Sequence, residues 1–365
     1  MKDFIKTILV KHFPAEYEQI FKSSDLLQYL DLKTSAIYGN AKTRKSLGNI
    51  YAIYSILHYY ICDGFFNNAT RYKQFGGYEF TKLLTFCRSL YGGEKIQNHA
   101  LNSRLNLEFD NKSASASNKG KYIIVQDNGK YMIHIDYLYV NDKDISEAVV
   151  EIINEYVRLL RKKDDDLIEK LENLSNERDI NIVKTSIEDL LTYDSEARVF
   201  EIISYAILKN YYKNTKIFIG YTKEELNEEY LTLYKTGRTN ANDGGIDFVM
   251  RPLGRFFQVT EVGNYDKYFL DIEKVLHFPI TFVIKTDKTK EVIKKEFDAY
   301  IQQRSGGMKT IIDKYNNAIE EIITINELKA WYKELNDESV KNIMQDIIQY
   351  YKVEMNFNDI NDSED

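Results

Sequence analysis

The sequence predicts an α/β fold, in which a mostly helical N-terminal domain precedes a C-terminal domain with a mixed sheet flanked by helices. Two observations support this fold class. Before residue 110, apolar side chains recur at the spacing of a helix, as in the stripe Ile50, Ile53, Tyr54, Leu57 and Ile61. From residue 195 onward, a helical segment is followed by strand-like segments and then by further helical segments, which is the layered pattern of an α/β domain.

Changes in composition and in hydrophobic periodicity divide the chain into four segments. Its 365 residues are enough for two or three domains. Residues 1–109 form the helical domain, and residues 110–179 form a connector that holds a hairpin and a charged helical stretch. Residues 180–355 form the sheet-containing domain, and residues 356–365 form an acidic tail that we expect to be frayed.

The connector begins with a small, polar run at residues 110–120, which predicts a loop. Strand-like runs at 122–126 and 130–139 flank Asp127-Asn128-Gly129. Asn-Gly between two such runs predicts a β-hairpin. Helical periodicity over residues 145–160 then leads into a charged helix face or turn.

The C-terminal domain carries most of the predicted strands. Its predicted elements are a helix at 195–212, strands at 216–220, 245–251, 255–262 and 280–285, and helices that continue to about residue 353. The second and third strands are joined by the short turn Pro252-Leu253-Gly254, so we expect them to be antiparallel neighbours.

Composition excludes several classes of protein. The net charge of −7 gives no overall basic signal, but DNA contact needs only a local basic groove. The two cysteines form no CxxC pair, which favours a reducing, cytoplasmic location. We expect no signal peptide and no membrane span, because the long apolar runs that both require are missing. Without HExxH or GxxxxGK[ST], neither a zinc hydrolase nor a nucleotide cofactor is expected.

Asp247 is the residue whose setting most strongly indicates chemistry. An aspartate inside a strand is costly unless its charge is used, and the alternative interpretation is an edge-strand Asp paired with a Lys or Arg. Gly244-Gly245 just before it allows backbone to approach a ligand closely. In one register Asp247 shares a face with Gln258 and Thr260, whereas a slip of one residue would reverse that arrangement.

A family resemblance rests on these residues. A helix with Phe200-Glu201, a Gly-Gly-Ile-Asp strand, a short turn and a strand with a polar pair together resemble the PD-(D/E)XK nuclease superfamily, and type II restriction endonucleases most of all. The similarity covers about residues 194–285. It implies a restriction-endonuclease-like sheet in which an Asp and an acidic partner hold Mg²⁺, while a Lys orients or activates the attacking water.

The resemblance assigns roles to four residues. Asp247 matches the family Asp, Gln258-Val259-Thr260 takes the place of Glu-x-Lys, and Glu201 matches the helix glutamate. It therefore implies Asp247, Gln258, Thr260 and Glu201 as catalytic residues, with Asp247, Glu201 and Gln258 holding Mg²⁺. Two positions depart from the pattern, because Gln258 offers only a neutral carbonyl oxygen and Thr260 offers no ammonium. Glu261 and Lys267 are the nearest residues that could compensate.

Three polar segments are candidates for DNA contact. Two of them, at residues 33–46 and 95–104, combine basic, amide and hydroxyl side chains that suit phosphates and base edges. The alternative for both is a polar loop followed by a helix N-terminus. The candidate contacts are Lys33, Tyr38, Asn40, Lys42, Arg44 and Lys45 in the first, Asn98, Asn102 and Arg104 in the second, and Arg238 and Asn240 upstream of Asp247.

The expected function is a Mg²⁺-dependent type II restriction endonuclease that hydrolyses double-stranded DNA at a specific sequence and leaves 5′-phosphates. A symmetric duplex target favours a homodimer. Three alternatives stay open: a repair or non-specific defence nuclease of the same fold, a DNA-binding module with a degenerate site, and a helical scaffold protein.

Overall fold

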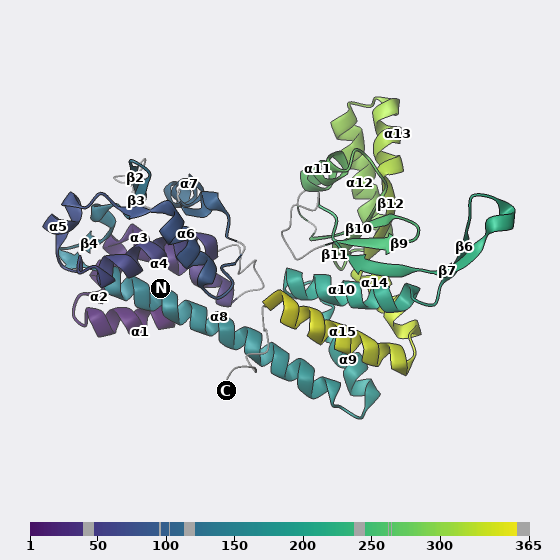
Figure 1. Cartoon of the computed structure of the whole chain (residues 1–365), viewed down its shortest axis with the longest axis horizontal. Coiled ribbons are helices and arrows are strands. Elements are labelled where there is room, and N and C mark those ends of the chain that lie inside the picture. The colour runs from purple at the N-terminus through teal and green to yellow at the C-terminus, as the bar shows by residue number, and fades with distance from the viewer. Residues whose placement is uncertain are drawn as a thin grey trace. The chain divides into compact units, whose positions relative to one another are not determined.

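The computed structural model describes residues 1–38, 47–94, 96–101, 103–112, 121–236, 245–261, 263 and 265–355. The chain forms two compact units, residues 1–165 and residues 166–365 (Figure 1). Helix α8 (Ser146–Ser175) contains the boundary between them. The first unit includes the hairpin, which was predicted to lie in the connector at residues 110–179, so the compact units and the predicted segments divide the chain at different residues.

The first unit is mostly helical. Helix α4 is buried nearly all round because apolar residues fill most of its positions, and Ile50, Ile53 and Leu57 of the predicted stripe are fully buried. The helices are α1 (Asp3–His12), α2 (Tyr17–Ser23), α3 (Asp25–Lys33), η1 (Thr34–Ile37), α4 (Leu47–Cys62), α5 (Ala69–Gln74), α6 (Phe80–Ser89), η3 (Asn98–Leu101), α7 (Ser103–Lys112) and η5 (Ile135–Tyr137).

Short strands complete the first unit. They are β1 (Tyr78–Glu79), β2 (Ile124–Asp127), β3 (Lys130–Ile133), β4 (Tyr139–Val140) and β5 (Lys143–Asp144). Strands β2 and β3 are antiparallel and join through Asn128 and Gly129, whose φ values are 47° and 78°. Positive φ at both central residues is what a two-residue hairpin turn requires, so the predicted hairpin is confirmed.

The second unit is an α/β domain. Its helices are α9 (Ile180–Leu190), α10 (Ala197–Tyr212), η6 (Lys223–Glu225), α11 (Tyr265–Lys274), α12 (Lys290–Ser305), α13 (Lys309–Ala318), α14 (Ile325–Glu334) and α15 (Asp337–Met355). Its strands are β6 (Lys216–Ile219), β7 (Asn227–Tyr230), β8 (Thr232–Lys235), β9 (Phe248–Arg251), β10 (Arg255–Glu261), β11 (Ile280–Lys285) and β12 (Ile319–Thr324).

Five of these strands form a mixed sheet in the order β12-β11-β10-β9-β8. The pairs β8–β9 and β9–β10 are antiparallel, whereas β10–β11 and β11–β12 are parallel. The predicted α/β class with a mixed sheet is therefore confirmed, as is the antiparallel pairing across the Pro252-Leu253-Gly254 turn. Strands β6 and β7 pair with each other as a separate hairpin.

Helices cover both faces of the sheet (Figure 1). On one face, Phe248, Phe257 and Val283 pack in a cluster with residues of α10, α14 and α15. On the other face, Phe282 and Ile284 pack with residues of α11, α12 and α13. We call these the α10 face and the α11 face. Among the described residues, no helix is both long enough and apolar enough to cross a membrane.

Candidate active site

Asp247 lies immediately before β9, where the ladder between β9 and β10 ends. The last pair is Phe248 with Phe257, and the same register extended by one residue would place Asp247 opposite Gln258. The Asp247 backbone N–H donates to the Phe257 carbonyl oxygen at 2.9 Å. Its Oδ2 accepts a hydrogen bond from the Val259 N–H at 2.7 Å. The carboxylate is therefore held against the backbone of β10 at the end of the ladder.

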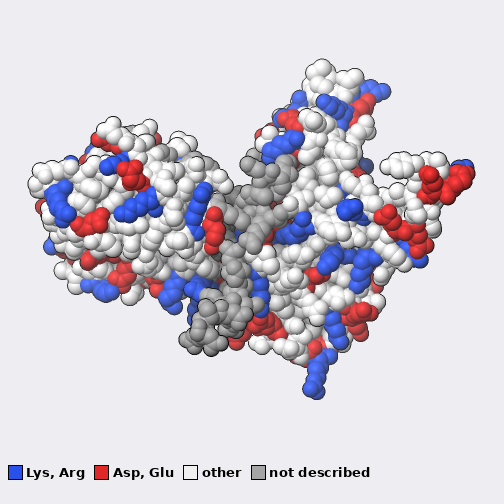
Figure 2. Space-filling model, viewed as in Figure 1, with Lys and Arg blue, Asp and Glu red and all other residues white. Residues whose placement is uncertain are grey.

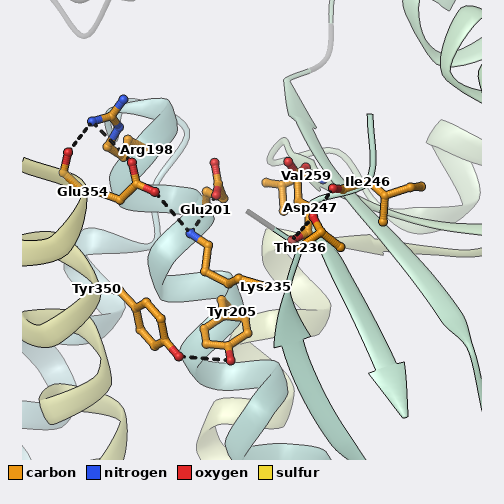
Figure 3. A network of polar contacts seen from close by, with 10 residues as sticks. All are labelled: Arg198, Glu201, Tyr205, Lys235, Thr236, Ile246, Asp247, Val259, Tyr350 and Glu354. Carbon is orange, nitrogen blue, oxygen red and sulfur yellow. Dashed lines mark hydrogen bonds and ion pairs between the residues drawn. The ribbon is translucent and has the colours of Figure 1, made fainter. Parts of the chain in front are cut away.

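The alternation of faces breaks at this aspartate. Residues 246 and 248 would share a face in a regular strand, yet Ile246 belongs to the cluster on the α11 face and Phe248 to the cluster on the α10 face. On the β8 side, Thr236 Oγ1 donates to the Asp247 carbonyl oxygen at 3.1 Å, and its backbone N–H donates to the same oxygen at 3.0 Å. Segments from both neighbouring strands thus fix the backbone of Asp247 (Figure 3).

Gln258 is buried on the α11 face, with a relative exposure of 6%. It lies in register with Phe282 of β11. Its Nε2 donates to the Val259 carbonyl oxygen at 3.3 Å, whereas its Oε1 has no hydrogen-bond partner within the described part of the chain. A buried carbonyl oxygen without a partner costs about 1–3 kcal/mol, so such a group is retained where a ligand, an ion or water completes it.

Thr260 is a packing residue in this structure. It lies in register with Ile284 on the α11 face, and it is buried. Burial raises the pKa of Tyr268 on α11, and a hydrogen bond with the Thr260 side chain acts in the opposite direction. The Thr260 hydroxyl is thereby directed to a core tyrosine. Lys267, the other residue considered for compensation, is exposed on α11.

Glu201 lies on the side of α10 that faces the sheet, within a buried ionic network (Figure 3). Its Oε1 is 2.9 Å from Lys235 Nζ at the end of β8. Lys235 Nζ is also 4.0 Å from Glu354 Oε1 on α15, and Glu354 is 3.7 Å from the Arg198 guanidinium. The network contains two carboxylates and two cations, so its charges balance. Glu201, which the resemblance implies as a Mg²⁺ ligand, forms an ion pair with Lys235 in this structure.

A second lysine–glutamate pair lies at the carboxyl end of β10 and β11. Lys285 is in register with Glu261, and its Nζ is 2.5 Å from Glu261 Oε1. The same ammonium donates to the Ser195 carbonyl oxygen just before α10 at 2.8 Å. Neither Lys285 nor Lys235 was predicted as a site residue from the sequence. Each is the last residue of its strand. Because ligands of open α/β sheets bind beyond the carboxyl ends of strands, a lysine at that position is the signal that could have identified them.

The site therefore combines some of the implied residues and separates others. Asp247 directly precedes β9 and Gln258 lies on the neighbouring strand β10, whereas Glu201 contacts the sheet from α10 and Thr260 packs against α11. Among the described residues, no cluster of three or more His, Cys, Asp or Glu side chains is arranged to hold a metal ion. Mg²⁺ is commonly held by one or two carboxylates, with water and substrate phosphates completing its shell. The Asp247 carboxylate and the Gln258 carbonyl oxygen are oxygen donors of that kind.

The predicted DNA contacts have varied settings. The Lys33 ammonium is 2.6 Å from Glu108 Oε1 and is largely buried, so its charge is neutralised inside the first unit. Tyr38, Asn98 and Arg104 are exposed. The other candidates lie outside the described residues; they are Asn40, Lys42, Arg44, Lys45, Asn102, Arg238 and Asn240.

Charge on the visible surface is mixed in sign (Figure 2). Acidic side chains gather at the end of the β6–β7 hairpin, where Glu224, Glu225 and Glu228 are exposed. That end of the hairpin is unsuited to contact phosphates, because like charges repel.

Comparison with protein-family models, curated proteins and solved structures gave no significant match to this chain.

Proposed function

We propose that this protein is a Mg²⁺-dependent endonuclease of the restriction type that hydrolyses double-stranded DNA. The observation that carries the proposal is the pair formed by Asp247 and Gln258. The Asp247 carboxylate accepts a hydrogen bond from the Val259 N–H at the end of the β9–β10 ladder, and the adjacent residue Gln258 carries a buried carbonyl oxygen that has no partner within the described residues. Oxygen donors of this kind are the ligands that a hard cation such as Mg²⁺ prefers, and a substrate phosphate can supply further oxygen ligands.

The order of the elements also supports the proposal. A helix that carries Glu201 precedes β8, β9 and β10, and helix α11 then connects β10 to the parallel strand β11. The sheet is mixed and has α10 on one face and α11 on the other, and a mixed sheet flanked by helices is the coarse architecture on which the proposal draws. Asp247 immediately precedes β9, the second strand of that order, and Gln258 lies on the third, β10.

The reaction requires charge stabilisation and a nucleophile. Bound Mg²⁺ would supply Lewis acidity and would lower the pKa of a bound water molecule. Asp247 and Gln258 would hold the ion, and the Val259 N–H fixes the orientation of the Asp247 carboxylate. Water adds its oxygen to phosphorus, and its proton passes to solvent. The bond from phosphorus to the 3′ oxygen breaks, and that oxygen takes a proton. The products are a 5′-phosphate and a 3′-hydroxyl.

Plasmid cleavage in the presence of Mg²⁺ tests the proposal through Asp247→Asn. Asparagine retains an oxygen that can accept from the Val259 N–H, but it lacks the charge. We expect the variant to cleave at least about 100-fold more slowly than the parent protein. The control is Asp346→Asn, which alters a buried aspartate 2.6 Å from Lys209 in the same unit. Equal rates for the parent protein and Asp247→Asn would show that the site assignment is wrong.

The products distinguish the proposed specificity from its alternatives. Discrete fragments with a constant end sequence are expected for a restriction enzyme, whereas a smear would indicate a repair or defence nuclease. DNA binding without cleavage in either Mg²⁺ or Mn²⁺ would indicate a DNA-binding module.

We also propose a homodimer, because a two-fold assembly matches a symmetric duplex target. Sedimentation in solution gives the mass that tests this.

A further inference from the structure

Strands β6 and β7 form a hairpin that projects from the rest of the second unit (Figure 1). Every residue of the two strands is exposed except Ile217, which is half-buried against the cluster on the α10 face. Among the described residues, no third strand pairs with either of them. An isolated two-stranded hairpin is only marginally stable in water, and a stable sheet needs further strands or a covering element. The outer part of this hairpin therefore has two open edges and little packing of its own.

The two open edges differ in how they are protected. Charged side chains, proline or a bulge usually protect an open edge, because an unprotected edge pairs with other chains. On β7, the adjacent residues Glu228 and Glu229 supply such charges. On β6, the run Ile217-Phe218-Ile219 is apolar, and Phe218 is 64% exposed. The one charged residue of β6, Lys216, is neutralised within the hairpin, since its Nζ is 2.7 Å from Glu228 Oε1.

The backbone of Phe218 is directed to the open edge of β6. At the base of the hairpin, the Leu231 N–H donates to the Thr215 carbonyl oxygen at 3.0 Å, so these two residues form a hydrogen-bonded pair. Hydrogen-bonded and non-hydrogen-bonded pairs alternate along an antiparallel ladder, and the pair Phe218–Glu228 lies three positions further on. The N–H and C=O groups of Phe218 and Glu228 therefore point away from the ladder, each to its own open edge.

A second copy of β6 fits this edge in the antiparallel direction. A two-fold axis perpendicular to the sheet keeps the same face of both copies on the same side, so a residue can lie opposite its own copy. With Phe218 opposite Phe218, the two rings form a cross-strand aromatic pair, and each Ile217 lies opposite Ile219. On β7, the arrangements about the strand centre place Glu228 opposite Glu228 or Glu229 opposite Glu229, and like charges directly opposite are destabilising.

We infer that the open edge of β6 is the surface through which two copies of this chain associate, by antiparallel pairing of β6 with β6 about Phe218. The resulting four-stranded sheet has the order β7-β6-β6-β7 and carries Phe218 and Tyr230 of both copies on one face. The inference rests on the proposed function only through the homodimer, whose surface it names. The contact is short, so we expect weaker association than for an interface that buries about 800 Å² per partner.

Sedimentation velocity of the full chain at concentrations up to about 100 µM tests the inference with two proline variants. Phe218→Pro removes the N–H that points to the open edge of β6 and leaves the bonds to β7 in place. Two-fold symmetry doubles the loss, so we expect the dissociation constant of the dimer to rise at least about tenfold. The matched control is Glu228→Pro, which removes the outward N–H of the other edge and should leave the dissociation constant unchanged.

The melting temperatures of the two variants show that both remain folded. Equal dissociation constants for the two variants, whether both are raised or both are unchanged, would overturn the assignment of the β6 edge. A parent protein that sediments as a monomer over the whole range of concentration would overturn it as well.

Cross-linking identifies the surface without changing the backbone. In a Cys62→Ser background, which removes the exposed cysteine, a short bis-maleimide should join Phe218→Cys to its own copy. Glu228→Cys should stay unlinked under the same conditions. Equal yields of linked dimer for the two variants would contradict pairing about Phe218.

The outcomes distinguish this inference from the proposed function. A monomeric protein that cleaves DNA keeps the nuclease proposal and refutes this inference. A dimer that Phe218→Pro does not weaken keeps the homodimer and refutes its assignment to β6. A protein that associates through β6 but cleaves no DNA supports this inference and refutes the nuclease proposal.

Discussion

Replacing Gln258 by methionine should stabilise the protein and weaken the proposed DNA cleavage. Methionine follows the shape of the glutamine side chain but carries no polar oxygen, and it adapts readily to an irregular core. Gln258 is buried and its Oε1 has no partner within the described residues. The substitution therefore removes an unsatisfied group from the interior. If the same oxygen binds the cation, the substitution also removes a ligand.

The size of the stability change follows from the hydrogen bonds. Removing a buried carbonyl oxygen without a partner recovers about 1–3 kcal/mol. The variant loses the bond from Nε2 to the Val259 carbonyl oxygen, which at 3.3 Å is long and contributes about 0.5–1 kcal/mol. The net gain is then about 0–2.5 kcal/mol, with a midpoint slightly above 1 kcal/mol. For a domain of about 150–250 residues, a gain of about 1 kcal/mol corresponds to a rise in melting temperature of roughly 2–4 °C.

Two measurements on the same preparation test this prediction. Thermal or urea unfolding should show the gain in the free energy of unfolding, and the rate of plasmid cleavage should fall at least about tenfold. The control is Asn210→Leu, since this buried amide bonds the Ala206 carbonyl oxygen at 2.9 Å and Asp346 Oδ2 at 3.2 Å. Removing those bonds should destabilise the protein by about 1–3 kcal/mol. A Gln258→Met variant that is destabilised like the control would refute the claim that Oε1 is unsatisfied.

Three further predictions concern the same chain. Lys235→Met should lower the free energy of unfolding by about 3 kcal/mol, measured in urea, because it leaves the buried Glu201 carboxylate without its lysine. Gly245→Ala should cost about 1–3 kcal/mol in the same assay, because the residue has a φ of +86° and a new Cβ would lie 2.9 Å from Asp271 Oδ1. Burial raises the pKa of the Cys87 thiol to about 11. A thiol reagent at pH 8 should therefore modify only the exposed cysteine in the folded protein and both cysteines in urea; two fast-reacting thiols in the folded state would contradict this.

Local sequence signals predicted the elements around the site well. The strands that became β9, β10 and β11 were expected from apolar runs bounded by turn residues, and the short turn after residue 251 fixed the antiparallel pairing of β9 and β10. The hairpin at Asn128-Gly129 was predicted for the same reason, because turn chemistry and strand pattern are both encoded within a few residues. These features depend on neighbours in the sequence.

The directions of the candidate site side chains could not be obtained in this way. Regular alternation places Asp247 with Gln258 and Thr260, but the structure breaks the alternation between Ile246 and Phe248. The break depends on packing against α10 and α11, which no local pattern records. The partner of Glu261 was missed because the pairing of β10 with β11 is parallel and spans α11, so Lys285 is distant in sequence.

Polar groups along β10 and its neighbours differ in how well they are satisfied. At the amino end, the Arg255 guanidinium donates to Thr281 at 2.9 Å and lies 3.4 Å from Glu320, so a charged residue is satisfied by its neighbours. In the middle of β10, Gln258 has an oxygen without a partner among the described residues, and beside the carboxyl end Lys285 of β11 is buried next to Glu261. Close by, Gly245 adopts a backbone conformation that other residues avoid. Departures from local rules that lower stability persist where function requires them. Gln258, Lys285 and Gly245 are three such departures near Asp247, and they support the proposal that the chemistry lies beside this residue.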